Sequence, residues 1–444
     1  MAAGDALLTD LYQLTMLQGY FRESLTQTAS FEFFIRSLPS SRNFFVAAGL
    51  EQLLEFLSGL AFSAEDCDWL RSTGHFAGDF LEYLRELRFT GKVSAMPEGT
   101  ICFPNEPLVR ITAPLPEAQI VETRLINLLQ FQTMIASKAV RSVIAARGRT
   151  VVDFGLRRAH GAEAGLLAAR ASYLAGFAGT SNVLAGRRFG IPLFGTMAHS
   201  YVMAHDSEAE AFVRFVTSQP DPAVLLIDTY DTLRAAQTLV QLAPGLLEQG
   251  FGIQGVRIDS GDLMTLSRST RDILDKGGLT QCQVVVSGDL DEYAVHDLMA
   301  AGAPIDGFGI GTQLVTSADV PVLNCAYKLE EYAGRPRRKR SPGRQTLPGQ
   351  KQVFRALDEG GLMRHDVIEL CDHAAEGEPL LTEVMRGGQR ISATEPLKEI
   401  RARVAQQLRQ LPDSLHALER AEPYPVLLGH ALAEMVDAME QSGR

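Results

Sequence analysis

Val151-Val152-Asp153-Phe154-Gly155-Leu156-Arg157-Arg158 opens the stretch that decides the fold, which runs from Val151 to Glu208. It continues through Gly179-Thr180-Ser181-Asn182 and then through Gly195-Thr196-Met197-Ala198-His199-Ser200. Twice, a short apolar run rich in β-branched residues ends at small or charged residues and gives way to a helical pattern. This order predicts parallel βα units, in which polar residues follow the carboxyl end of each strand. Two adjacent arginines suit an anionic ligand, and a histidine beside a hydroxyl suits proton or phosphoryl chemistry.

The same rhythm of strand and helix continues to about residue 312. Strand-like runs end at six positions, and each is followed by a tail containing Gly, Asp, Ser or Thr. One or two such tails are ordinary turns, but six in series predict a site, because a barrel gathers its strand ends on one face. The fold class that we expect is therefore α/β, with an α/β barrel at its centre. The six positions are Asp153, Phe194, Ile227, Ile258, Val286 and Phe308.

The segment before the barrel has a different character. Residues 1–114 mix helices and strands without a βα rhythm, which predicts an α+β domain. Its first helix is expected to begin at a capping pair, Thr9 and Asp10. A single long helix is expected from Pro116 to Ala146, at the start of a barrel catalytic domain that spans residues 115–330.

The segment after the barrel completes the domain plan. Residues 331–395 predict a return segment that packs on the N-terminal domain. Within it, a basic loop rich in Pro and Gly at 334–352 precedes strand patterns at 353–355 and 362–369. Residues 396–444 are charged and predict a helical C-terminal tail.

The composition limits the class of protein. The chain has 444 residues, too many for one ordinary core, so two or three domains are expected. Apolar residues make up 46% and charged residues 21%, as in a soluble globular protein. The formal net charge of -11 argues against a general nucleic-acid surface. No apolar run reaches the roughly 18 residues of a membrane span, and the start of the chain lacks a signal-peptide pattern, so cytoplasmic residence is expected. The 5 cysteines form no CxxC pair, so neither a disulfide framework nor a zinc site is predicted.

Two motifs at strand ends indicate the kind of ligand. Gly309-Ile310-Gly311-Thr312 offers unhindered backbone N–H groups that can hold a phosphate, although an ordinary tight βα turn explains it equally well. Arg257-Ile258-Asp259-Ser260-Gly261-Asp262 places a cation and two carboxylates around one strand end, and alternation points Arg257 and Asp259 to the same side. Such carboxylates can hold ribose hydroxyls or a Mg²⁺ ion that carries a diphosphate. A capped helix start explains the end of this motif but not Arg257 beside Asp259.

Other candidate residues are less specific. Ser287-Gly288-Asp289 supplies a second corner of the same type. His199 follows a strand end, but a lone histidine is more often structural, and its spacing from His205 forms no metal motif. The residues by themselves favour an α/β-barrel enzyme that acts on a phosphorylated, anionic small molecule with Mg²⁺. They do not identify the substrate.

Taken together, these motifs resemble those of nicotinate phosphoribosyltransferase. Two stretches on either side of the barrel strengthen the resemblance: Leu8-Thr9-Asp10-Leu11-Tyr12-Gln13-Leu14-Thr15-Met16 and Thr346-Leu347-Pro348-Gly349-Gln350-Lys351-Gln352-Val353-Phe354-Arg355. The resemblance covers about residues 5 to 375, in order and with plausible spacing. The tail beyond about residue 376 is not covered by it.

The resemblance implies a reaction and an architecture. Nicotinate and phosphoribosyl pyrophosphate would give nicotinate mononucleotide and diphosphate in NAD salvage, with ATP hydrolysis coupled to the step. The expected fold is the type II phosphoribosyltransferase arrangement, an α+β domain against an irregular α/β barrel, in a homodimer that shares its active sites. Mg²⁺ is expected to bind mainly through the diphosphate, so no protein metal ligand is assigned, and ATP is a co-substrate.

The resemblance also implies site residues. His199 matches the histidine that ATP transiently phosphorylates, and Arg257 and Asp259 match the pair that binds diphosphate and ribose. Phe154 and Tyr12 match the aromatic residues that sandwich the pyridine ring, Tyr12 coming from the other subunit. The remaining substrate-binding residues that it implies are Asp10, Arg157, Thr196, Ser200, Ser287, Gly288, Asp289, Gly309, Gly311 and Thr312.

The roles of these further residues follow the same resemblance. Arg157 matches an arginine near the nicotinate carboxylate and the diphosphate, where a charge-assisted hydrogen bond fits. Residues 288–289 and 309–312 match the corner that binds ribose and the 5′-phosphate. The basic loop has no assigned role; our hypothesis is that Arg335–Arg344 folds over the anionic substrates as a lid, the alternative being a solvated connector.

Four other functions compete with this one. A nicotinamide-specific relative shares the barrel and the histidine, but such relatives place a glycine after a single arginine, whereas this chain has Leu156-Arg157-Arg158-Ala159. Quinolinate phosphoribosyltransferase is shorter and lacks the His199 segment. A non-catalytic barrel that binds phosphoribosyl ligands predicts loss of the charged strand ends, which are all present. A barrel lyase or aldolase would need a lysine at a strand end, and none of the six tails has one.

Overall fold

The computed structural model describes residues 6–441, and the chain divides into two compact units. The first unit combines Met1–Ser137 with Val322–Arg444, and the second is Lys138–Pro321. The chain therefore leaves the first unit, builds the second and returns. No helix in the described part of the chain is long and apolar enough to cross a membrane.

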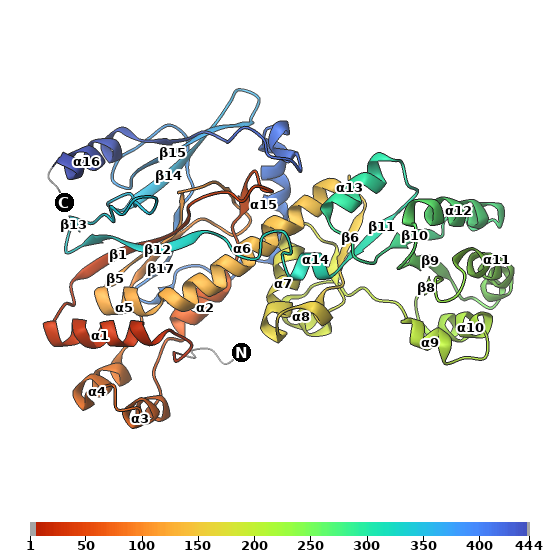
Figure 1. The fold of residues 1–444 in the computed structure, drawn as a ribbon, viewed down its shortest axis with the longest axis horizontal. Coiled ribbons are helices and arrows are strands. Elements are labelled where there is room, and N and C mark those ends of the chain that lie inside the picture. Colours follow the sequence, from red (N-terminus) through yellow and green to blue (C-terminus); the bar gives the residue numbers. More distant parts are fainter. Residues whose placement is uncertain (1–5, 442–444) are drawn as a thin grey trace. The chain divides into compact units, whose positions relative to one another are not determined.

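The first unit is built on a seven-stranded sheet in the order β13-β12-β1-β5-β3-β17-β18 (Figure 1). Strand β1 lies inside this sheet and pairs antiparallel with β5 on one side and β12 on the other. All but the first residue of β1 are buried. Because β12 follows the second unit in sequence, the returning chain completes a sheet that the N-terminal segment began. The strands are β1 Thr28–Ile35, β3 Lys92–Ala95, β5 Pro107–Pro114, β12 Cys325–Tyr332, β13 Arg335–Pro336, β17 Thr382–Arg386 and β18 Gln389–Arg390.

A second, four-stranded sheet in this unit has the order β16-β14-β15-β19. Its strands are β14 Lys351–Leu357, β15 Met363–Leu370, β16 Glu378–Pro379 and β19 Val426–Leu428. β19 lies in the segment 396–444, for which the sequence predicts only helix. Helices α15 Leu397–Gln410 and α16 His430–Gln441 are present there. The strand between them pairs parallel with β15, a tertiary contact that three apolar residues do not reveal by periodicity.

Helices and a short two-stranded sheet complete the first unit. Strand β2 (Phe45–Val46) pairs with β4 (Ile101–Cys102). Helix α3 begins with a capping box, in which Ser63 and Asp66 bond reciprocally to each other's backbone N–H groups. The helices are α1 Leu11–Glu23, α2 Leu50–Ser58, α3 Ala64–Ser72, α4 Gly78–Glu86 and α5 Leu115–Ile120.

The single long helix expected from Pro116 to Ala146 is two helices. Helix α5 ends at Ile120, and α6 runs from Glu122 to Ala145. At the break, the amide of Gln119 donates to Glu122 at 2.8 Å and to the side chain of Gln13 at 2.8 Å. Gln13 comes from α1, so a buried polar contact from elsewhere in the chain fixes the interruption.

The second unit contains a six-stranded parallel sheet in the order β7-β6-β11-β10-β9-β8 (Figure 1). The sheet is a half-barrel with β7 and β8 at its edges, which confirms the expected α/β class. The expected strand ending at Phe194 is wrong. Pro192 has no N–H to donate, and Leu193 forms only an isolated bridge to Thr180 of β7. The strands are β6 Thr150–Asp153, β7 Gly179–Thr180, β8 Ala223–Leu226, β9 Ile253–Ile258, β10 Gln283–Val286 and β11 Gly307–Ile310.

Helices follow the strands of this sheet, and many begin at a side-chain cap. Asn182, Ser207, Asp231, Asp262 and Asp291 each accept a hydrogen bond from a backbone N–H of the helix that they start. Four of these caps close the turns after β7, β8, β9 and β10, whereas Ser207 caps α10, which follows α9. The helices are α7 Ala162–Leu174, α8 Val183–Phe189, α9 His199–Met203, α10 Glu208–Ser218, α11 Thr232–Glu248, α12 Leu263–Lys276, α13 Glu292–Ala300 and α14 Thr312–Val315.

A buried ion cluster joins three segments of the second unit. The Lys138 ammonium lies 2.6 Å from Glu292 at the start of α13 and 2.9 Å from Asp319 beyond α14. Arg141 contacts the other oxygen of Glu292 at 2.9 Å. Because α13 and α14 each follow a strand-end loop, the cluster holds both loops to α6.

A second buried charge cluster lies under the basic loop in the first unit. The Lys351 ammonium contacts Glu32 at 2.9 Å and donates to the Leu347 and Gly349 carbonyls. Glu330, which is 1% exposed, lies nearby. Burial raises the pKa of Glu330 to about 8; Lys351 opposes the shift, and Glu32 adds to it.

This pKa makes stability depend on pH. Because the folded-state pKa of Glu330 lies above that of the unfolded chain, its contribution is fully present below about pH 4.5 and is lost as the pH rises through about 8. Each pKa unit corresponds to about 1.4 kcal/mol, so we expect the free energy of unfolding of the wild type to fall by roughly 3–5 kcal/mol between pH 5 and pH 9. In Glu330→Gln this fall should be absent. Urea unfolding at several pH values measures this. The matched control is Glu331→Gln, in a partly exposed neighbour; an equal change in both variants would contradict the prediction.

Candidate active site

The candidate site lies at the carboxyl ends of the parallel strands in the second unit (Figure 1). Arg257 in β9 is its central cation. Its guanidinium donates to the Thr196 hydroxyl at 3.2 Å and lies 3.7 Å from the Asp259 carboxylate. The guanidinium carbon stands 5.9 Å from the centre of the Phe154 ring. Three separate loops thus converge on one arginine.

The charged guanidinium of Arg257 lies in a largely buried environment of low dielectric constant. Burial lowers its pKa from the usual value, Asp259 and Asp228 oppose this shift, and Arg157 adds to it. Nε of Arg257 is buried and has no hydrogen-bond partner in the described part of the chain. A buried donor without a partner is costly, so a bound anion would stabilise this arginine.

Asp259 is tied to the strands on both sides of β9. Ser287, after β10, donates to its carboxylate at 2.5 Å. Its own N–H donates at 3.0 Å to Asp228, which follows β8, and the Ser260 hydroxyl donates to the same Asp228 oxygen at 2.6 Å. The other Asp228 oxygen is buried without a partner among residues 6–441. Asp228 belongs to the polar tail that follows Ile227, and the sequence alone predicts no role for it.

Three glycines allow the loops to approach this closely. A Cβ on Gly288, whose φ is +99°, would lie 2.0 Å from the carbonyl oxygen of Asp259. A Cβ on Gly309 would lie 2.4 Å from the Phe154 ring, and one on Gly311 would lie 3.2 Å from the Phe154 carbonyl oxygen. The ring therefore packs directly against the backbone of β11.

Asp153 shapes the turn that carries Phe154 and Arg157. It is buried and accepts hydrogen bonds from the Gly155 N–H at 2.8 Å and from the Thr180 hydroxyl at 2.7 Å. Burial raises the pKa of Asp153, and these two hydrogen bonds oppose the shift. Arg157 follows in a short 3-10 turn, where its side chain is exposed.

His199 is the first residue of α9 and is partly exposed. Its Nδ1 lies 3.1 Å from the Thr229 hydroxyl, which follows β8. Ser200 is exposed beside it. Asp289, after β10, is also exposed and adopts a positive φ of 47°. Thr312 starts α14 after β11.

Two of the sequence-predicted residues, Asp10 and Tyr12, belong to the first unit. Asp10 occupies the N-cap position of α1 but makes no capping hydrogen bond, and its carboxylate accepts from the Thr123 hydroxyl at 2.8 Å. Tyr12, in the first turn of α1, is 50% exposed.

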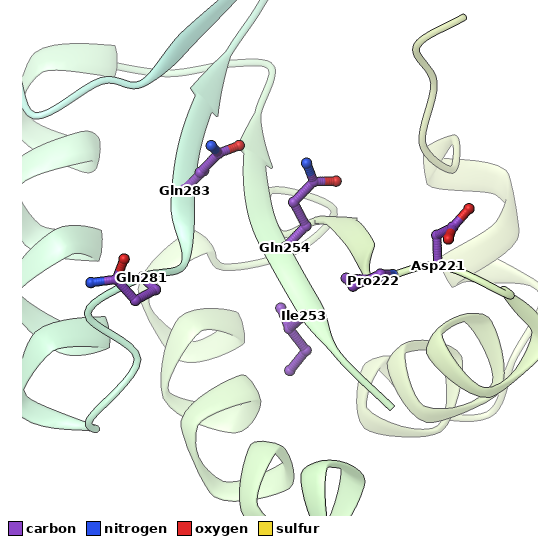
Figure 2. A pocket seen from close by; sticks show the side chains of 6 residues that line it. All are labelled: Asp221, Pro222, Ile253, Gln254, Gln281 and Gln283. Atoms are coloured by element: carbon purple, nitrogen blue, oxygen red, sulfur yellow. The ribbon is translucent and has the colours of Figure 1, made fainter. Parts of the chain in front are cut away.

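A shallow pocket of about 430 Å³ lies at the other end of the same sheet (Figure 2). It is lined at the amino ends of β8, β9 and β10, chiefly by neutral side chains. It holds none of the buried charges that mark the opposite edge. The lining residues are Asp221, Pro222, Ile253, Gln254, Gln281 and Gln283.

Fold and site together define an α/β half-barrel protein whose strand ends carry a buried cation, two carboxylates and close-packed glycine loops. Residues 7–130 match the N-terminal domain of nicotinate phosphoribosyltransferase, residues 150–334 match the nicotinate phosphoribosyltransferase family, and residues 373–436 match its C-terminal domain. The chain belongs to the nicotinate phosphoribosyltransferase family. The last of these matches corrects the sequence analysis, which found no resemblance beyond about residue 376.

Similar proteins cover nearly the whole chain. Nicotinate phosphoribosyltransferase pncB2 of Mycobacterium tuberculosis is 50% identical over 95% of this chain and 91% of its own. The Bacillus subtilis nicotinate phosphoribosyltransferase is 41% identical over 85% of this chain and 78% of its own. The crystal structure of human nicotinic acid phosphoribosyltransferase superposes with a TM-score of 0.88 and 29% identity, covering 97% of this chain and 99% of that one.

The packing of Gly309 against Phe154 can be tested within one strand. We expect Gly309→Ala to lower the free energy of unfolding by about 1–3 kcal/mol, because the new methyl group would force the Phe154 ring from its place. Gly307→Ala is the matched control in β11, since its Cβ would meet no atom closer than 3.5 Å. Denaturant unfolding followed by intrinsic fluorescence compares the two. An equal loss of unfolding free energy in the two variants would show that the position of the Phe154 ring does not depend on the absence of a side chain at residue 309.

Proposed function

We propose that this protein is a nicotinate phosphoribosyltransferase that joins nicotinate to phosphoribosyl pyrophosphate in NAD salvage. The products are nicotinate mononucleotide and diphosphate, with ATP hydrolysis coupled to the reaction. One observation carries the proposal: in a chain of this family, Arg257, Asp259 and Phe154 meet at the strand ends of the half-barrel.

The geometry suits the transfer. The bond between the ribose C1 and diphosphate breaks and its electron pair leaves with diphosphate, while the pyridine nitrogen of nicotinate forms the new bond to C1. Arg257 would bind the departing diphosphate through charge-assisted hydrogen bonds. Asp259, held by Ser287, would orient the ribose hydroxyls. No nucleophile on the protein is needed, because positioning lowers the barrier.

The pyridine ring would stack on Phe154, whose ring is fixed by the bare backbone of Gly309. Arg157 is exposed in the turn that follows Phe154 and can pair with the nicotinate carboxylate. Backbone N–H groups of the loops at residues 288–289 and 309–312 would bind the 5′-phosphate. A neutral amide in place of the carboxylate gains less from Arg157, which favours nicotinate over nicotinamide.

Mg²⁺ would be carried mainly by the diphosphate. The residues present fit such an ion, since Asp228 and Asp259 stand at neighbouring strand ends and one Asp228 oxygen is buried without a partner among the described residues. Within residues 6–441, no group of three or more His, Cys, Asp or Glu side chains is placed so that it could hold a metal ion. When bound, the ion would neutralise charge that develops on the departing diphosphate.

His199 would accept a phosphoryl group from ATP. It stands in the loop that also places Thr196 on Arg257, so a phosphate on its ring would add charge next to the diphosphate site. Thr196 and Ser200 flank the histidine and would bind the substrate there.

We further propose a homodimer with shared active sites, with Tyr12 and Asp10 reaching the site of the partner subunit. The apolar side chains of Leu8, Leu11 and Tyr12 are each about half exposed on and beside α1, which supports an interface there. Cytoplasmic residence stays a prediction.

The reaction is tested by mixing the protein with nicotinate, phosphoribosyl pyrophosphate and Mg²⁺, with and without ATP, and measuring nicotinate mononucleotide. We expect ATP to increase product formation in the wild type and to have no effect in His199→Ala, because the phosphoryl acceptor is lost. Product from nicotinamide but not from nicotinate would instead assign the amide-specific activity. Tight binding of phosphoribosyl pyrophosphate without product from either substrate would favour a non-catalytic binding protein.

The basic loop of the first unit has a fixed neck and an exposed tip. The Glu330 carbonyl accepts from the N–H groups of both Arg337 and Gly349, at 2.8 and 2.9 Å. Beyond this neck, Arg340 and Arg344 are exposed. A cationic tip on an anchored neck supports our proposal of a lid over the anionic substrates.

Neutralising the tip tests the lid. We expect Arg340→Gln with Arg344→Gln to raise the KM for phosphoribosyl pyrophosphate about tenfold or more, since a charge-assisted hydrogen bond contributes roughly 1.5–3 kcal/mol. Lys398→Gln with Arg409→Gln makes the same change in net charge at exposed positions of α15 and is the control. Steady-state kinetics at constant ionic strength measures both. An unchanged KM in the tip variant would leave the loop a solvated connector.

A further inference from the structure

The buried ion cluster on α6 is attached to two loops of the candidate site. Lys138 and Arg141 are buried on α6 and contact Glu292, which is fully buried at the start of α13. The Lys138 ammonium also lies 2.9 Å from the Asp319 carboxylate, beyond α14. Burial by itself would raise the pKa of Glu292, but Lys138 and Arg141 outweigh it and hold that pKa below its usual value. Glu292 is therefore a charged partner of both cations.

The short loop between β10 and α13 is anchored at both ends. It contains Gly288 at a φ of +99° and Asp289 at a φ of +47°. A side chain makes the left-handed conformation costly, so Asp289 keeps it only where the surroundings fix the loop. At the first end, Ser287 donates to Asp259. At the second end, Glu292 is held by the two cations of α6.

The loop after β11 has the same arrangement. Helix α14 begins at Thr312, and the Thr316 hydroxyl donates to the Thr312 carbonyl at 2.7 Å, which ties the following segment to the start of the helix. Ser317 is buried and adopts a φ of +43°, again in the left-handed region. Two residues later, Asp319 contacts Lys138. In both loops, a left-handed residue other than glycine thus stands shortly before a carboxylate that contacts Lys138.

Both loops belong to the proposed substrate site. Their backbone N–H groups, at residues 288–289 and 309–312, are those that would bind the 5′-phosphate. A hydrogen bond needs a set distance and direction, so the two loops must keep a fixed relation to each other if they bind one phosphate. A single cation that contacts a carboxylate at the end of each loop fixes that relation.

We propose that Lys138 is a positioning residue for phosphoribosyl pyrophosphate, because it holds the loops after β10 and β11 at the spacing that one phosphate requires. This inference rests on the proposed function, in which these loops bind the 5′-phosphate. Lys138 is 2% exposed, so it acts through Glu292 and Asp319. A buried ion cluster commonly adds no stability over well-packed apolar side chains, whereas only a cation binds two carboxylates at once. Geometry therefore explains the charge better than stability does.

The test compares Lys138→Met, which removes the charge from a side chain of similar length, with Lys138→Arg, which keeps the charge. Steady-state kinetics of the full-length protein gives KM for phosphoribosyl pyrophosphate and for nicotinate. We expect Lys138→Met to raise the first KM about tenfold, the effect of losing a charge-assisted hydrogen bond, and Lys138→Arg to recover most of this loss. KM for nicotinate should change little, because Phe154 and Arg157 lie in the loop after β6.

Arg271→Met is the matched control in the same unit. The Arg271 guanidinium binds a loop at the other end of β10, where it donates to the carbonyls of Leu279 and Cys282 at 2.8 and 2.5 Å. Its loss removes a cation that holds a loop but leaves the strand ends of the site unchanged. Thermal unfolding of each variant measures stability. A purely structural role for Lys138 predicts lower stability in both variants, with both KM values unchanged.

Asp319→Asn provides a second variant in case Lys138→Met does not fold. The Asp319 side chain is 20% exposed, so its charge can be removed at a smaller cost to the folded state. We expect KM for phosphoribosyl pyrophosphate to rise here too, by a smaller factor, because only the loop after β11 loses its anchor. Binding of ribose 5-phosphate, measured by isothermal titration calorimetry, should weaken in parallel, since this probe carries the 5′-phosphate without the diphosphate.

The outcomes separate the inference from the proposed function. An unchanged KM for phosphoribosyl pyrophosphate in the folded variants, or an equal rise in Arg271→Met, would overturn the inference and leave the proposed function intact. If the wild type forms no mononucleotide, the proposed function fails and ribose 5-phosphate decides. Weaker binding of this probe to Lys138→Met than to the wild type would still support the positioning role, whereas no binding to the wild type would overturn it.

Discussion

A line of hydrogen bonds at the carboxyl ends of the parallel strands holds the candidate site in place. Asp228 after β8 binds the backbone and the neighbouring hydroxyl of the β9 end, and Asp259 in turn accepts from Ser287 after β10. Each bond has a carboxylate as acceptor, which makes it stronger than a bond between neutral groups. If the carboxylate of Asp228 or of Asp259 were removed, the neighbouring strand end would lose its hydrogen-bond partner. The positions of Arg257 and of the glycine loops depend on this line.

The part of the site that could be predicted from sequence is the part encoded locally. A strand followed by Gly, Asp, Ser or Thr shows where a polar tail lies, and the parallel topology brings such tails together without further information. Arg257 and Asp259 could be paired because alternation along a strand is a short-range rule. The contact of Thr196 with Arg257 needs the fold of a loop, which no periodicity describes.

The errors have two physical causes. A strand was expected to end at Phe194, yet Pro192 interrupts the pairing and leaves an isolated bridge. One long helix was expected where Gln13, from a distant segment, fixes a break at the start of α6. In the same way, nothing in the residues around Glu330 signals its raised pKa, because that depends on burial and on Glu32. Tertiary contacts decided the helix break and the pKa of Glu330, whereas Pro192 acts within its own segment.

The order of strands in the first unit bears on how the chain is made. Strand β5 is synthesised soon after β1 and can pair with one of its edges. The other edge has no partner until β12 is made, and β12 lies beyond the whole second unit. At a synthesis rate of about 5–20 residues per second, that edge stays unpaired on the ribosome for roughly 15–60 seconds. During this time a strand containing Phe31 and Phe33 presents open hydrogen-bonding groups to other chains. The unpaired edge is therefore a place where the nascent chain is open to pairing with another chain, although β12 covers it in the finished sheet.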